Sequence, residues 1–182
     1  MIKDIDALVA YTRRKSESLA SLAKLNKRLS ITRPGCTPEA IRELRRLFPG
    51  LPATYFDIAK AVDLEGVSLG GFELTPFWSP GMSLVQCITL ANDVSCCGMA
   101  RQNAEYGTYA VAALEADMVS VVFRADFFKI GQVVLYEHDR PEALPGVLAD
   151  SFEQFLLIAG NLDEILGSRK SPDDWDVVYR RF

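Results

Sequence analysis

The sequence contains few of the residues that metal and nucleophilic chemistry use most often. There is one histidine in 182 residues, His138, and the four cysteines form no Cys-x-x-Cys pair. The adjacent thiols of Cys96 and Cys97 point in different directions in most backbones, so a zinc site would need distant cysteines to converge. We therefore expect reduced, partly buried thiols, with no metal and no cofactor.

Long apolar runs are also missing. The apolar runs are short segments such as residues 133–136, far below the roughly 18 residues that a membrane span needs. Residues 1–6 are charged and contain no apolar region of the kind found in secretory signals. We therefore expect a cytoplasmic protein that does not enter a membrane.

The motifs of common catalytic and phosphate-binding sites are absent. No serine lies in a Gly-x-Ser-x-Gly elbow, and the glycine-rich stretch 66–71 lacks the lysine of a P-loop and precedes a predicted strand. His138 and Asp139 are neighbours at a strand end, where their side chains should point to opposite faces, so we expect an exposed loop histidine rather than a general base. Acidic residues such as Glu115 and Asp117 have no matched partner in the sequence. We predict that the chain is not an enzyme.

The composition that remains is that of one globular domain with an uneven charge. Hydrophobic residues make up 49% of the chain and charged residues 24%, which is an ordinary globular mixture. Residues 1–50 carry 11 Lys or Arg and 5 Asp or Glu, whereas residues 51–168 carry 5 and 16. An acidic body disfavours nucleic acid and favours a basic partner, although a need for solubility would also explain it.

Hydrophobic periodicity predicts helices at both ends of the chain and strands in the middle. Helices are expected over residues 4–30, 37–48, 51–63 and 151–167, and strands over 67–69, 72–74, 109–114, 119–124 and 132–137. The pattern of residues 82–92 fits both a helix and a strand, and we favour a helix. Residues 95–107 and 141–145 are expected to be loops, and the apolar residues of 172–182 suggest a tail that docks on the body. Short connections between the strands favour antiparallel hairpins. The sequence therefore predicts an α+β fold, with a single mostly antiparallel sheet packed by helices, an N-terminal helix and a closing C-terminal helix.

Two stretches of the sequence share their order of elements with a known family. The first has Pro38-Glu39 opening a helix, Leu51-Pro52-Ala53-Thr54-Tyr55 opening another, a glycine turn at Gly66 and a strand at Phe72-Glu73-Leu74. The second has Gly131-Gln132-Val133-Val134 as a late strand and Ser151-Phe152-Glu153-Gln154-Phe155-Leu156 as a closing helix. Over residues 37–166 this order resembles the SUKH superfamily, which contains bacterial toxin-immunity proteins and fungal cell-wall regulators. Glu65 stands where the family often has a polar amide, the early helix is longer than usual, and residues 79–107 match nothing in the pattern.

The resemblance implies one domain over residues 1–182, with a helical extension at 4–30, a SUKH-like core at 37–166 and a tail at 172–182. Its motif residues are interpreted as structural, because Pro52 sets the first helical turn and Gly66 supplies a turn conformation. The apolar motif residues should seat two helices on the sheet. The full set is Leu51, Pro52, Tyr55, Gly66, Phe152, Phe155 and Leu156.

The function that the resemblance implies is that of an immunity protein. Such a protein binds a cognate toxin domain, often a nuclease, and occludes its active site or a nearby surface. A basic toxin would suit the acidic body, because complementary charge speeds association. We expect the partner surface to combine acidic residues with an aromatic anchor, at Glu65, Trp78, Asp93, Glu105, Tyr106, Glu115, Asp117, Asp126 and Asp139.

Two other functions stay open at this point. The chain could be a regulatory scaffold that assembles through the basic helix 4–30 and the tail 172–182, without any toxin. It could also be a hydrolase or transferase whose carboxylate pair forms only on folding, in which case a structure would show a pocket lined by converging acids.

Overall fold

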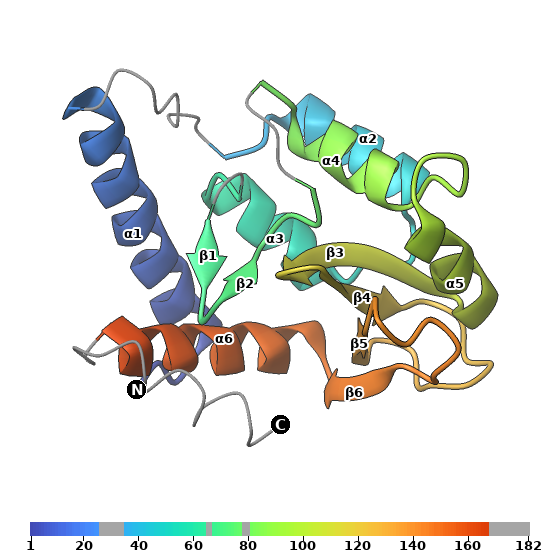
Figure 1. The fold of residues 1–182 in the computed structure, drawn as a ribbon. Helices are drawn as coiled ribbons and strands as arrows, with labels where there is room; N and C mark the ends of the chain where they lie inside the picture. Colours follow the sequence, from blue (N-terminus) through green and yellow to red (C-terminus); the bar gives the residue numbers. More distant parts are fainter. Residues whose placement is uncertain (26–34, 65–66, 78–80, 168–182) are drawn as a thin grey trace.

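The computed structural model describes residues 1–25, 35–64, 67–77 and 81–167. In this part of the chain six strands form one antiparallel sheet in sequence order, with helices on both faces (Figure 1). The strands are β1 (Ser68–Leu69), β2 (Phe72–Glu73), β3 (Thr108–Leu114), β4 (Asp117–Val122), β5 (Val133–Tyr136) and β6 (Gly146–Ala149). The helices are α1 (Ile5–Leu25), α2 (Pro38–Leu47), α3 (Ala53–Ala61), α4 (Leu84–Ala91), α5 (Gly98–Tyr106) and α6 (Phe152–Gly167). The α+β fold predicted from the sequence is confirmed.

The helix starts follow from local capping chemistry. The Thr37 hydroxyl oxygen accepts a hydrogen bond from the backbone N–H of Ala40 at 3.2 Å, and Pro38 occupies the first turn of α2. At α6 the Ser151 hydroxyl oxygen accepts from the backbone N–H of Gln154 at 3.1 Å. These caps confirm two helix starts that the sequence predicts.

The two faces of the sheet are covered by different helices. On one face α3 and α6 place Tyr55 and Phe155 against strand residues such as Val111. On the other face α5, together with Ala91 at the end of α4, covers a smaller cluster that includes Met118 and Tyr136. The sheet is therefore the middle layer of three, with its two edges at β1 and β6.

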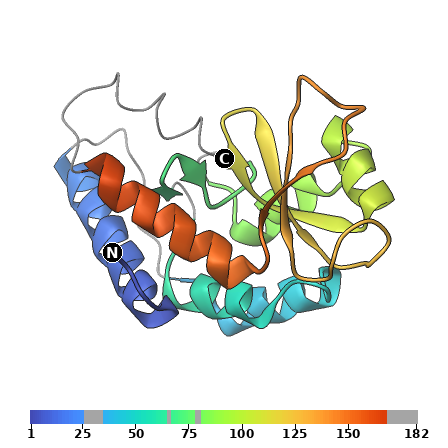
Figure 2. The same ribbon diagram turned by 90° about the horizontal axis from the view of Figure 1, so that it is seen from below.

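The N-terminal helix packs on the body through its first half. Figure 2 shows α1 and α6 side by side, and Leu8 of α1 is fully buried. The contact is close, because a Cβ added at Gly160 of α6 would lie 2.5 Å from Leu8 Cδ1. The predicted helix 4–30 is confirmed as far as Leu25, and its remainder lies outside the described residues, as does the tail 172–182.

The prediction of a loop over residues 95–107 is wrong, because α5 spans Gly98–Tyr106. Its inward face carries Ala100 and Asn103, both buried. The Asn103 carboxamide oxygen accepts hydrogen bonds from the hydroxyls of Thr108 and Ser120, each at 2.9 Å. Asn103 occupies a buried position of α5 at which most helices have an apolar residue. The helix therefore lacks a continuous apolar stripe, and its sequence does not show the hydrophobic periodicity of a helix.

Strand β6 was not predicted at all. It contains only four residues, it lies at the edge of the sheet, and two of the four are exposed. A short, half-exposed segment gives little alternation of apolar and polar residues, so it resembles a loop in the sequence.

Candidate binding pocket

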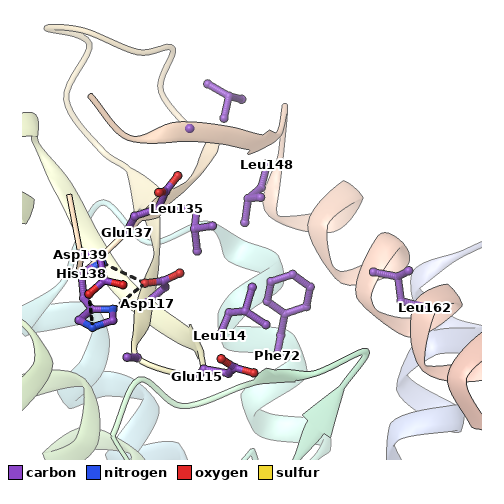
Figure 3. Close-up of a pocket in the computed structure, with 13 residues that line it drawn as sticks. Phe72, Leu114, Glu115, Asp117, Leu135, Glu137, His138, Asp139, Leu148 and Leu162 are labelled. Carbon is purple, nitrogen blue, oxygen red and sulfur yellow. Dashed lines mark hydrogen bonds and ion pairs between the residues drawn. The ribbon is translucent and has the colours of Figure 1, made fainter. Parts of the chain in front are cut away.

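A pocket of about 560 Å³ opens at one corner of the sheet (Figure 3). It lies between β2, the β3–β4 hairpin, the ends of β5 and β6, and α6. Its apolar lining comes from Phe72, Leu114, Leu135, Leu148 and Leu162. The pocket therefore continues the apolar surface that α6 buries elsewhere on the same face.

The charged side chains that line the pocket are acidic. Four carboxylates line it, and no lysine or arginine is among its described lining residues; the acids are Glu115, Asp117, Glu137 and Asp139. Arg140, which does not line the pocket, has its Nε 3.5 Å from Glu137 Oε2. We call these four residues the acidic rim.

Antiparallel pairing brings the rim together from separate segments. Met118 of β4 pairs with Tyr136 of β5, so the next residue on each strand, Asp117 and Glu137, lies at the same end of the sheet. Leu114 pairs with Asp117 across the β3–β4 hairpin, which puts Glu115 in the turn beside them. The rim is thus a consequence of two hairpins in register.

Glu115 has a backbone conformation that is unusual for its type. It forms a two-residue turn with Ala116 and has φ +54°, the only positive φ among the described non-glycine residues. This left-handed region costs a residue with a Cβ roughly 1–2 kcal/mol, and glycine avoids that cost. A glutamate at this point keeps a carboxylate at the pocket mouth (Figure 3).

His138 joins two of the rim carboxylates. Its Nδ1 lies 3.2 Å from Asp117 Oδ1 and its Nε2 lies 2.8 Å from Asp139 Oδ1, while its backbone N–H donates to Asp117 Oδ1 at 2.9 Å. The side chain is half exposed (50%), as expected of a loop histidine. The expectation that His138 and Asp139 point apart is wrong, because β5 ends at Tyr136 and strand alternation does not apply beyond it.

The other residues expected at the partner surface lie elsewhere. Tyr106 and Glu105 stand at the opposite end of β3, where the Tyr106 ring meets Phe127 edge-on at 5.0 Å. Asp126 lies near them and is ion-paired with Arg124. The expected surface is therefore divided, and among its described residues only Glu115, Asp117 and Asp139 meet in the pocket.

Asp93 has a local structural role at the end of α4. Its Oδ1 accepts hydrogen bonds from the Ser95 hydroxyl at 2.6 Å and from the Ser95 backbone N–H at 2.8 Å. These bonds hold the pKa of the Asp93 carboxyl below its usual range. Glu65 and Trp78, which the sequence also predicts at the partner surface, lie outside the described residues.

Two residues that line the pocket, Glu137 and His138, were not predicted at the partner surface from the sequence. A signal for Glu137 was available, because the predicted antiparallel strands 119–124 and 132–137 place the start of one near the end of the other. Leu148 of the apolar lining had no such signal, since it belongs to the unpredicted strand β6.

The apolar motif residues lie in the core. Leu51, Tyr55, Phe152, Phe155 and Leu156 are all buried, and the rings of Tyr55 and Phe152 lie 5.5 Å apart. Burial raises the pKa of the Tyr55 hydroxyl. Pro52 precedes α3 as its N-cap residue, and Gly66 lies outside the described residues.

The four cysteines are free thiols, of which Cys87 is buried and Cys96 exposed. Within the described ranges, no three His, Cys, Asp or Glu side chains are placed to hold a metal ion. No helix in those ranges has the length and apolar character that crossing a bilayer requires.

The pocket combines an apolar floor, an acidic rim and a histidine held between two carboxylates. Such a lining suits a cationic group carried on an apolar stem. Comparisons of the chain with protein-family models and with curated proteins find no match.

Proposed function

We propose that this chain is a non-enzymatic immunity protein of the SUKH type, which binds a basic toxin domain and covers its active site or a neighbouring surface. The observation that carries the proposal is the acidic rim, with four carboxylates and no cationic side chain among the described residues that line the pocket. A nuclease is the toxin class that fits best, because proteins that bind phosphate backbones present lysine and arginine.

The pocket chemistry favours long cationic side chains of a partner. Lysine and arginine pack their methylene stems on apolar surface and keep the charged head in a polar environment. In this pocket the stem would lie on Leu135 and Leu148, and the head would reach Glu115 or Glu137. Complementary potentials would also raise the association rate at low salt.

A hydrolase is the second candidate, because the pocket does gather acidic side chains around a histidine. General-base catalysis requires an imidazole nitrogen that can reach the substrate. Here each ring nitrogen of His138 contacts a carboxylate, Nδ1 that of Asp117 and Nε2 that of Asp139, so neither nitrogen is open to a substrate. The Asp139 side chain is 84% exposed, so this arrangement lies at the surface and in contact with solvent. No serine, threonine, cysteine or lysine lines the pocket in the described part of the chain. Binding therefore has more support than catalysis.

The scaffold alternative relies on the basic N-terminal helix. Leu8 of that helix is buried against α6, and Tyr11 and Lys15 are bonded to Asp163 of α6. The described side chains on this face of α1 are thus used within the chain, which leaves less apolar surface for assembly.

The proposal is tested by co-expressing the chain with the product of the adjacent reading frame. The wild-type chain should rescue growth and co-purify with that product. Reversing the rim charges with Glu115→Lys and Glu137→Lys should abolish both effects, whereas Asp6→Lys with Asp57→Lys, two exposed acids away from the pocket, should abolish neither. Rescue that survives the rim reversal, or substrate turnover by the purified chain, would contradict the proposal.

A further inference from the structure

The two edges of the sheet differ in how they are covered. At β1, Lys15 of α1 donates to the carbonyl oxygen of Ser68, and Asp163 of α6 accepts from the Gly70 backbone N–H at 3.1 Å. A Cβ at Gly70 would lie 2.6 Å from Leu162 Cβ, so α6 lies directly against this edge. At β6, β5 pairs on one side, and no other strand in the described residues pairs with the second side.

The β6 edge has little of the protection that exposed strands usually have. Natural edge strands discourage pairing with charged residues, proline or a twisting bulge. Strand β6 contains a bulge at Leu148 but no charged residue and no proline. The four residues of β6 are Gly, Val, Leu and Ala, and Val147 is 50% exposed with Leu144 60% exposed just before it. The backbone of this strand is therefore accessible to another chain.

The irregularity in β6 directs a side chain into the pocket. Val133 pairs with Ala149 and Val134 pairs with Val147, so Leu148 is the extra residue of a bulge. Leu148 lines the pocket together with Gly146 and Val147. The free edge and the acidic rim are thus parts of one continuous surface.

We propose that the partner adds an extended basic segment to the free edge of β6, so that the sheet continues into the partner and alternate side chains enter the pocket. This inference rests on the proposed function and specifies the binding mode at the same site. In an added strand, residues two apart lie on the same face and about 7 Å apart. A cationic side chain on that face can reach Glu137 or Glu115, while the backbone pairs with β6.

The proposal is tested with a blocked heptapeptide of alternating lysine and valine as the probe and the full chain as the target. Hydrogen exchange of the backbone amides over residues 144–149 should slow about tenfold when the free peptide is at ten times its Kd. The same peptide with N-methylated backbone, or with glutamate in place of lysine, should bind at least about tenfold more weakly, a loss of about 1.4 kcal/mol.

A protein variant tests the surface that the β6 edge and the pocket share. Val147→Lys places a like charge on the edge and should weaken binding of the lysine peptide about tenfold. The control Ile130→Lys makes the same change at an exposed residue of the β4–β5 loop and should leave binding unchanged. Binding that is insensitive to Val147→Lys would overturn the proposal.

Three further outcomes would also overturn it. Amides of 144–149 that are already protected in the free protein would mean that this chain or a second copy covers the edge. Equal binding of the N-methylated peptide would mean that only the pocket is used. A complex with the cognate toxin that forms without slowing exchange over 144–149 would refute the added strand and leave the proposed function intact.

Discussion

Asp117 Oδ1 accepts a hydrogen bond from the backbone N–H of His138 at 2.9 Å and lies 3.2 Å from His138 Nδ1. Asp117 begins β4 and His138 follows β5, so the pair fastens the loop after β5 to the neighbouring strand. This contact fixes one wall of the pocket.

Asp117→Ala should lower the free energy of unfolding by about 1 kcal/mol, because a half-buried acceptor of a backbone N–H is lost. Hydrogen exchange over residues 137–145 should become faster. His138→Ala is the matched control, since it keeps the backbone hydrogen bond and should cost less than about 0.5 kcal/mol. Equal losses in urea denaturation would show that the imidazole, not the backbone bond, holds the loop.

A second prediction concerns the contact between α1 and α6. Asp163 Oδ2 accepts from the Tyr11 hydroxyl at 2.5 Å, and Asp163 Oδ1 lies 2.5 Å from Lys15 Nζ. Hydrogen bonds to charged groups contribute about 1.5–3 kcal/mol, so Tyr11→Phe should destabilise the protein by that amount in urea denaturation. Tyr109→Phe serves as the control, because its hydroxyl has no hydrogen bond in the described residues. No difference between the two variants would contradict the role of Asp163.

The same tyrosine predicts a loss of stability at alkaline pH. Burial, followed by the hydrogen bond to Asp163, raises the pKa of Tyr11 above its usual value. Above about pH 10 the unfolded chain therefore binds fewer protons than the native chain, and stability falls as pH rises. The free energy of unfolding between about pH 9 and about pH 11 should fall more steeply for the wild type than for Tyr11→Phe. Tyr136, whose pKa burial raises to about 12, contributes equally to both proteins.

A substitution of Glu115 is expected to raise the stability of the protein and to weaken its binding of a partner. Glycine accepts the φ of +54° at this turn without strain. After allowance for the greater freedom of glycine in the unfolded chain, Glu115→Gly should stabilise the protein by about 1 kcal/mol. The same variant should bind a basic partner more weakly, because it removes a rim carboxylate. Glu115→Gln, which keeps the strain and removes the charge, should weaken binding without raising the midpoint of thermal unfolding.

Much of the fold follows from local signals that the sequence displays. Thr37 and Ser151 cap helices where a hydroxyl precedes an apolar stripe, and the strands 109–114 and 119–124 are joined by a connection too short for a crossover. Helix α5 was not predicted because Asn103, a polar residue, faces the sheet. Its burial depends on Thr108 and Ser120, which come from two different strands.

The candidate site was predicted only in part for a related reason. Glu115, Asp117 and Asp139 were expected at an acidic surface because of their charge and loop positions, but nothing local separates them from Glu105 or Asp126. The register of the strands separates these acids. Because Met118 pairs with Tyr136, the first three acids lie at the pocket, whereas Glu105 and Asp126 lie at the opposite end of the same strands. Which acidic residues meet is therefore determined by the pairing of strands that are distant in the sequence, and local composition does not reveal it.

The most direct test of the account is the affinity of the purified chain for the co-expressed toxin domain, measured by calorimetry at low and high salt. The account predicts that Glu115→Gln with Glu137→Gln weakens binding at low salt at least about tenfold, or about 1.4 kcal/mol. It also predicts that this difference shrinks at high salt, because screening reduces the contribution of exposed charges. An unchanged affinity in the double variant would contradict the claim that the acidic rim binds the partner.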